Sequence, residues 1–228
     1  MKKVFSALFG LLSVSVFLVS SCFAKEPEHT ILNEEQLLAE MHKIAIPLYR
    51  KGDDKRHCVG FDFLLLPNGN TAYMGAGHCV NFGHLADPSG NSILYKNKFP
   101  LGEDYFVATR KKPANEIELA KLSFAPLNVG ESYYVFGQHS AADPISSLGI
   151  ICLEYSGIVK NGNVNLYTFR VVSVSSPLIR FTPGVSGSPV LNKYGEVVAI
   201  GTAMNIADPL LIAAVPLFLM KEKILSLQ

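Results

Sequence analysis

Short runs of alternating or continuous apolar residues fill the chain from about residue 45 to about residue 203. These runs are VGFDFLLL, NTAYMGA, DYFVATR, EIELAKLSF, SYYVFGQ, GIICLEYSGIV, NLYTFRVVSVS, SPVLN and EVVAIGTA. Turn-forming clusters such as PNGN, DPSG, KNGN and NKYGE separate them. Many short strands with turns between them predict an all-β body, either an antiparallel sandwich or a barrel.

Helical spacing occurs at the two ends of this body. Asn33 precedes EEQLLAEMHKIA and Gln36 follows three residues later, which is a capping-box pattern. The apolar stripe of this first helix consists of Leu37, Leu38, Met41 and Ala45. The last stretch, VPLFLMKEKILSLQ, has its own stripe of Leu217, Met220, Ile224 and Leu227. We therefore expect a short helix at each end of the all-β body.

The first 24 residues have the pattern of an export signal. Lys2 and Lys3 precede the apolar run VFSALFGLLSVSVFLVSSCFA, which ends in a small residue. This pattern is typical of a secretory signal peptide, and we expect cleavage after Ala24. Two alternatives stay open. The run is about long enough to anchor the chain in a membrane, and VSSC resembles a bacterial lipobox that would lipidate Cys22. We predict an exported protein, periplasmic or secreted.

The composition agrees with a folded domain. Of the 228 residues 49% are apolar, enough for one domain or for two small halves that share a core. Lys plus Arg (20) nearly balance Asp plus Glu (19), and no basic block stands out. Nothing in this charge pattern indicates a nucleic-acid partner.

The segment TPGVSGSPV, residues 182–190, contains a candidate nucleophile. Glycines on both sides of Ser186 allow a sharp turn and bring backbone amides close to a substrate carbonyl. Ser188 is expected to be an ordinary loop residue. Taken alone the segment also fits a surface turn, so a base and its orienting group must come from elsewhere in the chain.

GAGHCV, residues 75–80, supplies a candidate base. His78 follows an apolar strand, Cys79 adjoins it, and Cys58 precedes the neighbouring run VGFDFLLL. An exported chain can oxidise a cysteine pair. A Cys58–Cys79 bridge would tie the base of a hairpin and fix the backbone that carries His78. Cys152 lies in the apolar run GIICLEYSGIV and is most simply a small core residue.

The neighbouring pairs His57-Cys58 and His78-Cys79 also suggest a zinc site as an alternative. Adjacent residues of a strand point to opposite faces, so each pair would chelate poorly. We therefore expect no metal and no cofactor.

GAGHCV resembles the histidine motif T-A-x-H-C of trypsin-like (chymotrypsin-fold) serine proteases. PGVSGSPV is similar to their serine motif G-[DN]-S-G-[GS]-P. NKYGEVVAIGTA and VGESYYVFG resemble strands of bacterial glutamyl-endopeptidase-like and HtrA-like members. The resemblance covers roughly residues 45–220 and implies two antiparallel β-barrels. The expected organisation is a signal peptide at 1–24, an N-terminal helical segment at 25–50, barrels at 51–125 and 126–215, and a C-terminal helix at 216–228. Residues 25–228 would form a single protease domain.

The resemblance also implies roles for single residues. Ser186 would be the nucleophile and His78 the general base, and the amides of Gly184 and Ser186 would form the oxyanion hole. Substrate would be bound by Ile200, Gly201 and Thr202, which resemble the strand edge beside the S1 pocket. Arg180 is near the position that often floors that pocket, where it could favour an acidic P1 residue or point to solvent.

The acid of the triad is ambiguous. The family motif is D-[IL]-A-[LV]-[LI]-K-L, and the matching region NEIELAKLSF has no aspartate. Glu116 and Glu118 both fit and share one face of a strand. We prefer Glu118, because apolar residues then continue the inward face. Val185, where the family has aspartate or asparagine, is a second departure.

The sequence therefore predicts an exported serine endopeptidase that acts on protein or peptide substrates through an acyl-enzyme. It predicts no membrane association unless Cys22 is lipidated, and it does not indicate the oligomeric state. A catalytically silent relative that acts as a binding module is the alternative. A structural β-protein with a chance motif match is a more distant one.

Overall fold

The computed structural model describes residues 30–50, 52–53, 55–95, 104–111, 118–139, 145–161, 164–205 and 207–227. The predicted signal peptide (1–24), the alternative lipidation site Cys22 and the alternative acid Glu116 lie outside the described residues. No helix in the described part of the chain is long and apolar enough to cross a membrane.

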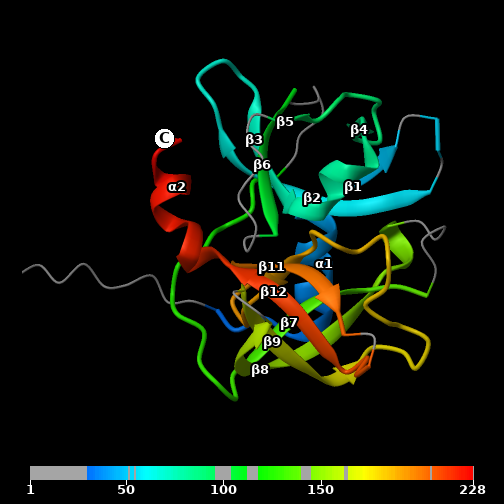
Figure 1. Cartoon of the computed structure of the whole chain (residues 1–228), viewed down its shortest axis with the longest axis vertical. Helices are drawn as coiled ribbons and strands as arrows, with labels where there is room; N and C mark the ends of the chain where they lie inside the picture. Colours follow the sequence, from blue (N-terminus) through cyan, green and yellow to red (C-terminus); the bar gives the residue numbers. More distant parts are fainter. Residues whose placement is uncertain are drawn as a thin grey trace, which may run out of the picture.

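The strands form two six-stranded antiparallel units, one above the other in Figure 1. The first is a curled sheet in the order β4-β1-β2-β3-β6-β5. Its strands are β1 (Ala45–Arg50), β2 (Arg56–Leu65), β3 (Thr71–Ala76), β4 (Leu85–Ala86), β5 (Leu94–Tyr95) and β6 (Tyr105–Arg110). The second is a closed barrel in the order β10-β11-β12-β9-β8-β7. Its strands are β7 (Ser132–Gly137), β8 (Gly149–Asn161), β9 (Val164–Val174), β10 (Pro189–Leu191), β11 (Val197–Met204) and β12 (Leu211–Pro216).

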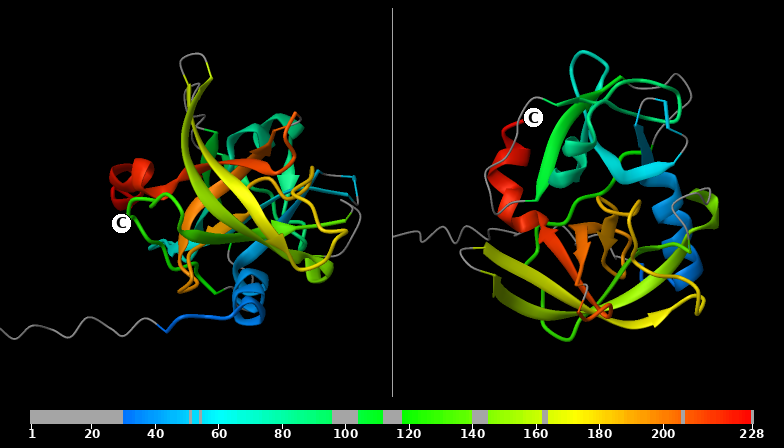
Figure 2. Two further views of the ribbon diagram at one scale, coloured as in Figure 1. Left: turned by 90° about the horizontal axis from the view of Figure 1, so that it is seen from below. Right: turned by 45° about the vertical axis from the view of Figure 1, so that its right-hand side comes forward.

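The prediction of an all-β fold built from two antiparallel barrels is confirmed. The helices are short: α1 (Glu34–Ile44), η1 (Gly77–Phe82), η2 (Ile145–Ser147), η3 (Leu217–Met220) and α2 (Lys221–Leu225). Figure 2 shows the long β8–β9 hairpin projecting from the second barrel.

The N-terminal helix begins with the predicted capping box. Asn33 Oδ1 accepts from the Gln36 amide, and Gln36 Oε1 accepts from the Asn33 amide, both at 2.9 Å. The helix packs against β7 and β8 of the second barrel. It passes directly into β1 at Ala45, so residues 45–50 belong to the first sheet rather than to the N-terminal helical segment predicted for them.

Two further segments connect the units. In α2, which follows the last strand of the second barrel, Lys223 Nζ donates to the Tyr105 hydroxyl of the first sheet at 2.9 Å. The described part of the predicted strand EIELAKLSF, residues 118–124, is a linker instead of a strand. Its Ala120 amide donates to Asp62 O in β2, and its Ser123 amide donates to Val197 O in β11. Because the linker forms hydrogen bonds with one unit at Ala120 and with the other at Ser123, it does not continue as a strand of either sheet.

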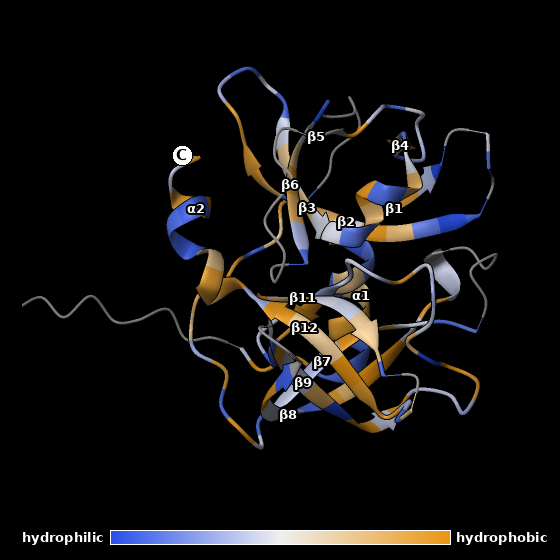
Figure 3. Ribbon diagram, viewed as in Figure 1, coloured by the Kyte–Doolittle hydropathy of each residue, from blue (hydrophilic) through white to orange (hydrophobic). Residues whose placement is uncertain are grey.

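The larger apolar cluster crosses from one unit to the other. It contains Val59 and Phe61 of β2 together with Val135 and Ile200 of the second barrel. Figure 3 shows apolar residues along β11 and β12 and polar residues on the outer turns. The two units therefore bury a common surface, which fixes their relative position.

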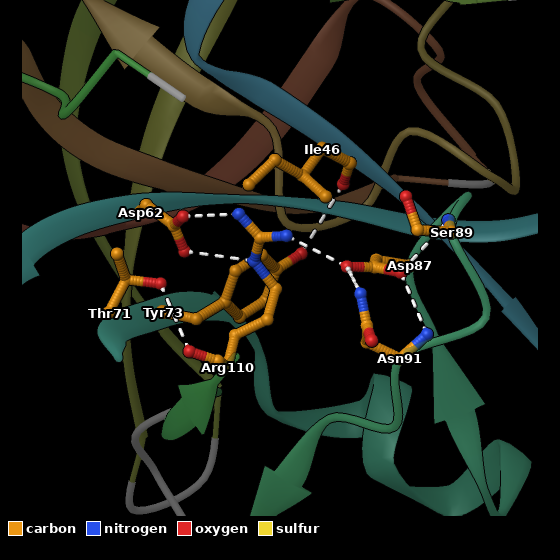
Figure 4. A network of polar contacts seen from close by, with 8 residues as sticks. All are labelled: Ile46, Asp62, Thr71, Tyr73, Asp87, Ser89, Asn91 and Arg110. Carbon is orange, nitrogen blue, oxygen red and sulfur yellow. Dashed lines mark hydrogen bonds and ion pairs between the residues drawn. The ribbon is translucent and has the colours of Figure 1, made fainter. Parts of the chain in front are cut away.

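A buried ion cluster occupies the interior of the first sheet (Figure 4). Arg110 on β6 donates from Nε and Nη2 to the Asp62 carboxylate and from Nη1 to Asp87 Oδ2 at 2.8 Å. Asp87 Oδ1 also accepts the amides of Ser89 and Asn91, at 3.0 and 2.9 Å. All three charged side chains are at least 97% buried, since none is more than 3% exposed. Their charges are therefore compensated by each other rather than by water.

We expect Arg110→Met to lower the free energy of unfolding by about 3–5 kcal/mol, because it leaves two buried carboxylates without their cation. Urea denaturation at neutral pH measures this change. Arg170→Met is the matched control: its ion pair with Asp208 is exposed, with the nitrogen 3.8 Å from the oxygen. The control should cost less than about 1 kcal/mol. Equal losses in the two variants would contradict a structural role for the buried cluster.

Candidate active site

His78 lies where β3 ends and the 3₁₀ helix η1 begins. The predicted disulfide between Cys58 and Cys79 is present, with the two Cα atoms 6.2 Å apart. It joins β2 to η1 directly beside His78. The histidine backbone is therefore held both by the pairing of β2 with β3 and by a covalent bond.

The carboxylate that contacts His78 is that of Asp104. Asp104 Oδ2 lies 2.8 Å from His78 Nδ1, and Asp104 Oδ1 accepts the His78 amide at 2.7 Å. An ionised carboxylate only accepts, so this contact places the ring proton on Nδ1 and leaves the Nε2 lone pair as the basic site. The side chains of His78 and Asp104 are 37% and 39% exposed, so a substrate can reach the ring.

The geometry favours Asp104 over the predicted Glu118. Glu118 is exposed at the start of the linker, and His78 Nδ1 is occupied by Asp104. The reason lies in the strand pairing: β6 pairs with β3, and Ala76 lies opposite Tyr105. The residue just before β6 is therefore placed beside the residues just after β3. The preference for Glu118 depended on matching NEIELAKLSF to the family's acid motif and on the apolar residues that would continue the inward face. The usable signal is an aspartate directly before the apolar run YFVATR.

Gly77 allows this approach. A Cβ at position 77 would lie 2.9 Å from the Tyr105 amide nitrogen and 3.1 Å from Asp104 Oδ1. Any side chain at position 77 would displace the carboxylate from His78.

The serine loop of the second barrel packs onto β2 and β3 of the first sheet. The Val59 amide donates to Ser186 O at 2.8 Å, and Cys79 Sγ lies 3.9 Å from the same oxygen. Gly187 has a φ of +91°, and a Cβ there would lie only 2.0 Å from Val59 O. This position therefore requires glycine for two reasons, its backbone angle and its contact with β2.

The amides of Gly184 and Ser186, predicted as oxyanion donors, differ from those of the three other residues between 184 and 188. The amides of Val185, Gly187 and Ser188 donate to Thr182 O, Gly201 O and Val185 O, respectively. Those of Gly184 and Ser186 have no acceptor among the described residues. Two free backbone donors beside a serine hydroxyl can stabilise a developing oxyanion.

The Ser186 hydroxyl itself donates to Thr202 O at 3.1 Å rather than to His78. The three residues predicted to bind substrate differ in whether their backbone N–H and C=O groups already have partners. Both backbone groups of Gly201 are taken by Gly187 and Ser188, and Ile200 pairs with Pro189 and Val215. Thr202 alone presents its carbonyl to the serine. Its hydroxyl donates to Ala213 O at 3.2 Å.

Arg180 folds back onto its own loop. Its Nη1 donates to Pro177 O and Ile179 O at 2.6 and 2.8 Å. This contact does not favour the predicted role of Arg180 as a recognition group for an acidic P1 residue.

One group of potential metal ligands occurs in the described part of the chain, Cys58, His78 and Cys79, whose ligand atoms lie within 4.8 Å of one another. Both sulfur atoms belong to the disulfide and cannot act as thiolate ligands. The group instead shows that the His78 ring lies beside the disulfide that contacts Ser186. The loop that carries the predicted nucleophile thus lies next to the disulfide beside the predicted base, at the boundary between the two units.

No protein-family model matches the chain, and no curated protein matches it in sequence. Solved structures match it in fold. The inactive form of the Ser343Ala mutant of Rv3671c from M. tuberculosis H37Rv has a TM-score of 0.61 at 12% identity, covering 84% of this chain and 89% of that one. The HtrA-type protease AlgW with a decapeptide gives 0.63 at 12%, covering 86% and 67%, and the serine endoprotease from Yersinia pestis gives 0.59 at 15%, covering 87% and 67%. The chain therefore has the two-barrel fold of trypsin-like serine proteases.

Proposed function

We propose that this protein is an exported serine endopeptidase that hydrolyses peptide bonds through an acyl-enzyme. The observation that carries the proposal is the contact of Asp104 with His78 Nδ1, beside a serine loop with two free amides. These groups come from three distant segments of the chain. A purely structural ion pair would have no need of solvent access, yet the side chains of His78 and Asp104 are both partly exposed.

In the proposed reaction, Ser186 Oγ attacks the substrate carbonyl and His78 Nε2 takes its proton. The hydroxyl first leaves Thr202 O by a rotation about its Cα–Cβ bond, a change between ordinary rotamers. Asp104 keeps the imidazole oriented and stabilises its cation, and the amides of Gly184 and Ser186 bind the oxyanion. His78 then gives the proton to the leaving amine. In the second half of the reaction His78 takes a proton from water, which attacks the acyl-enzyme and releases the acid product and free Ser186.

The substrate class follows from the end of β11. Strand β10 pairs with β11 only as far as Ile200, while β12 continues to pair with it up to Met204. Beyond Gly201 the side of β11 that faces away from β12 has no strand partner among the described residues. An extended peptide can add to such an edge by main-chain hydrogen bonds. This supports a protein or peptide substrate next to Thr202 and Ser186.

The second candidate function is that of a catalytically silent binding protein. The hydrogen bond from the Ser186 hydroxyl to Thr202 O favours it, because the hydroxyl is bonded to a carbonyl instead of to the proposed base. Both functions use the same site, and they differ in whether Ser186 reacts.

We expect a fluorophosphonate probe to label the purified protein at Ser186, because activated serines react with it and ordinary hydroxyls do not. Labelling should disappear in Ser186→Ala and persist in Ser156→Ala, which removes an exposed hydroxyl on β8. Intact-mass spectrometry gives the readout. A folded wild-type protein that takes up no label would exclude the protease and leave the binding protein.

We expect Asp104→Asn to reduce kcat by about 10⁴-fold, since an amide orients the imidazole in the wrong tautomer. Glu118→Gln is the matched control and should stay close to the wild-type rate, because Glu118 is exposed and His78 Nδ1 is occupied by Asp104. Steady-state hydrolysis of a fluorogenic peptide measures both. A large loss in Glu118→Gln with none in Asp104→Asn would restore Glu118 as the acid.

A further inference from the structure

We propose that Gln138 is a positioning residue that sets the orientation of the oxyanion hole. This inference rests on the proposed function. Gln138 follows β7 directly and is fully buried. Its main chain is fixed, because its amide donates to Arg180 O at 2.8 Å and its carbonyl accepts from the Arg180 amide at 3.1 Å.

The side chain of Gln138 reaches the serine loop. Its Nε2 donates to Thr182 Oγ1 at 3.1 Å and to Pro183 O at 2.5 Å. A carbonyl only accepts, so the atom that faces Pro183 O has to be the amide nitrogen. Gln138 thus binds the carbonyl of the same peptide unit that contains the Gly184 amide.

Holding that carbonyl fixes the direction of the Gly184 amide. A trans peptide is planar, so its C=O and N–H point in opposite directions. Residues 182–185 form a turn closed by the Val185 amide on Thr182 O, with Gly184 at a φ of +100°. These features define a type II turn with proline first and glycine second.

A type II turn has a close competitor. Rotation of its central peptide by about 180° gives a type I turn with the same ends. Pro183 fits both types, and glycine tolerates both signs of φ. The rotation would reverse the Gly184 amide and place a carbonyl oxygen where the oxyanion should bind. The hydrogen bond from Gln138 to Pro183 O holds the turn in the type II form.

The other donor of the hole is held in the same manner. The Ser186 amide shares its peptide unit with Val185 O, which accepts from Ser188 Oγ at 2.6 Å and from the Ser188 amide at 3.1 Å. Between them, Gly184 O accepts from Arg56 Nε of the first sheet at 3.0 Å. Each of three successive carbonyls is thus bound by a side chain, while the two oxyanion amides have no acceptor among the described residues.

The unpaired side-chain oxygen of Gln138 indicates that this residue does not serve to stabilise the fold. Its Oε1 is buried without a hydrogen-bond partner among the described residues. An unpaired buried acceptor is unfavourable, and an apolar side chain of the same size would avoid it. Pro183 is exposed, so water can bind its carbonyl if Gln138 is replaced.

The test uses Gln138→Met in the purified full chain, because methionine has a similar length and no donor. The readout is the second-order rate of fluorophosphonate labelling of Ser186 as a function of pH, together with Tm. Removing an oxyanion donor outright costs about 10²–10³-fold, and we expect loss of its positioning to cost about tenfold or more. The pH midpoint should not move, since the contact of His78 with Asp104 is untouched. Tm should stay within about 4 °C of the wild type.

Asn192→Leu is the control, since it also removes a side-chain amide that binds the backbone, at the far end of β10. It should lower Tm and leave the labelling rate unchanged. Gln138→Leu, which also lacks a hydrogen-bond donor and carries no titrating group, should lower the rate as Gln138→Met does, so the test does not depend on one variant.

A rate within twofold of the wild type in both Gln138 variants would overturn the inference. So would a loss of rate accompanied by a shifted pH midpoint, or by a fall in Tm as large as that of Asn192→Leu. Absence of labelling in the wild type is a different result: it would remove the proposed function and this inference with it.

Discussion

The hydrogen bond from the Val59 amide to Ser186 O is the contact on which the candidate site depends. It joins the middle of β2 to the serine loop of the other barrel, at 2.8 Å and in a buried position. The glycine at 187 is required by this contact, because a Cβ would overlap Val59 O. The Cys58–Cys79 disulfide lies next to the same place, so the packing that positions the serine also positions the histidine.

The candidate groups are divided between the two units, and each unit alone is incomplete. The first contributes the candidate base and acid, and the second contributes the candidate nucleophile and the two amides of the candidate oxyanion hole. The relative position of the units therefore has to be fixed as firmly as the strands within them. Three features do this: the shared apolar cluster, the linker with hydrogen bonds to β2 and β11, and α2, which reaches back to Tyr105.

The parts of this arrangement that could be predicted from sequence are those with a local signal. The capping box at Asn33, the strand spacing and the glycines around Ser186 each express a backbone preference of a few residues. The pairing of Cys58 with Cys79 also followed from a neighbouring strand pair. Asp104 could not be found in this way, because its place beside His78 depends on β6 pairing with β3 across a separation of 26 residues. Gln138 likewise contacts a residue of the serine loop that is 45 positions away in the sequence, and a contact of this kind leaves no periodic pattern in the sequence.

Val185 shows how a departure from the family pattern can be accommodated. The family has aspartate or asparagine at this position, where a polar side chain can bind within the serine loop. Here the side chain is fully buried in the apolar cluster and can form no such bond. The loop is held by its carbonyls instead, with donors from Gln138, Arg56 and Ser188. Polar anchoring of the loop carbonyls by these three side chains leaves position 185 free to contribute to the core. An apolar residue beside the serine is therefore compatible with a preorganised oxyanion hole and does not by itself indicate an inactive protein.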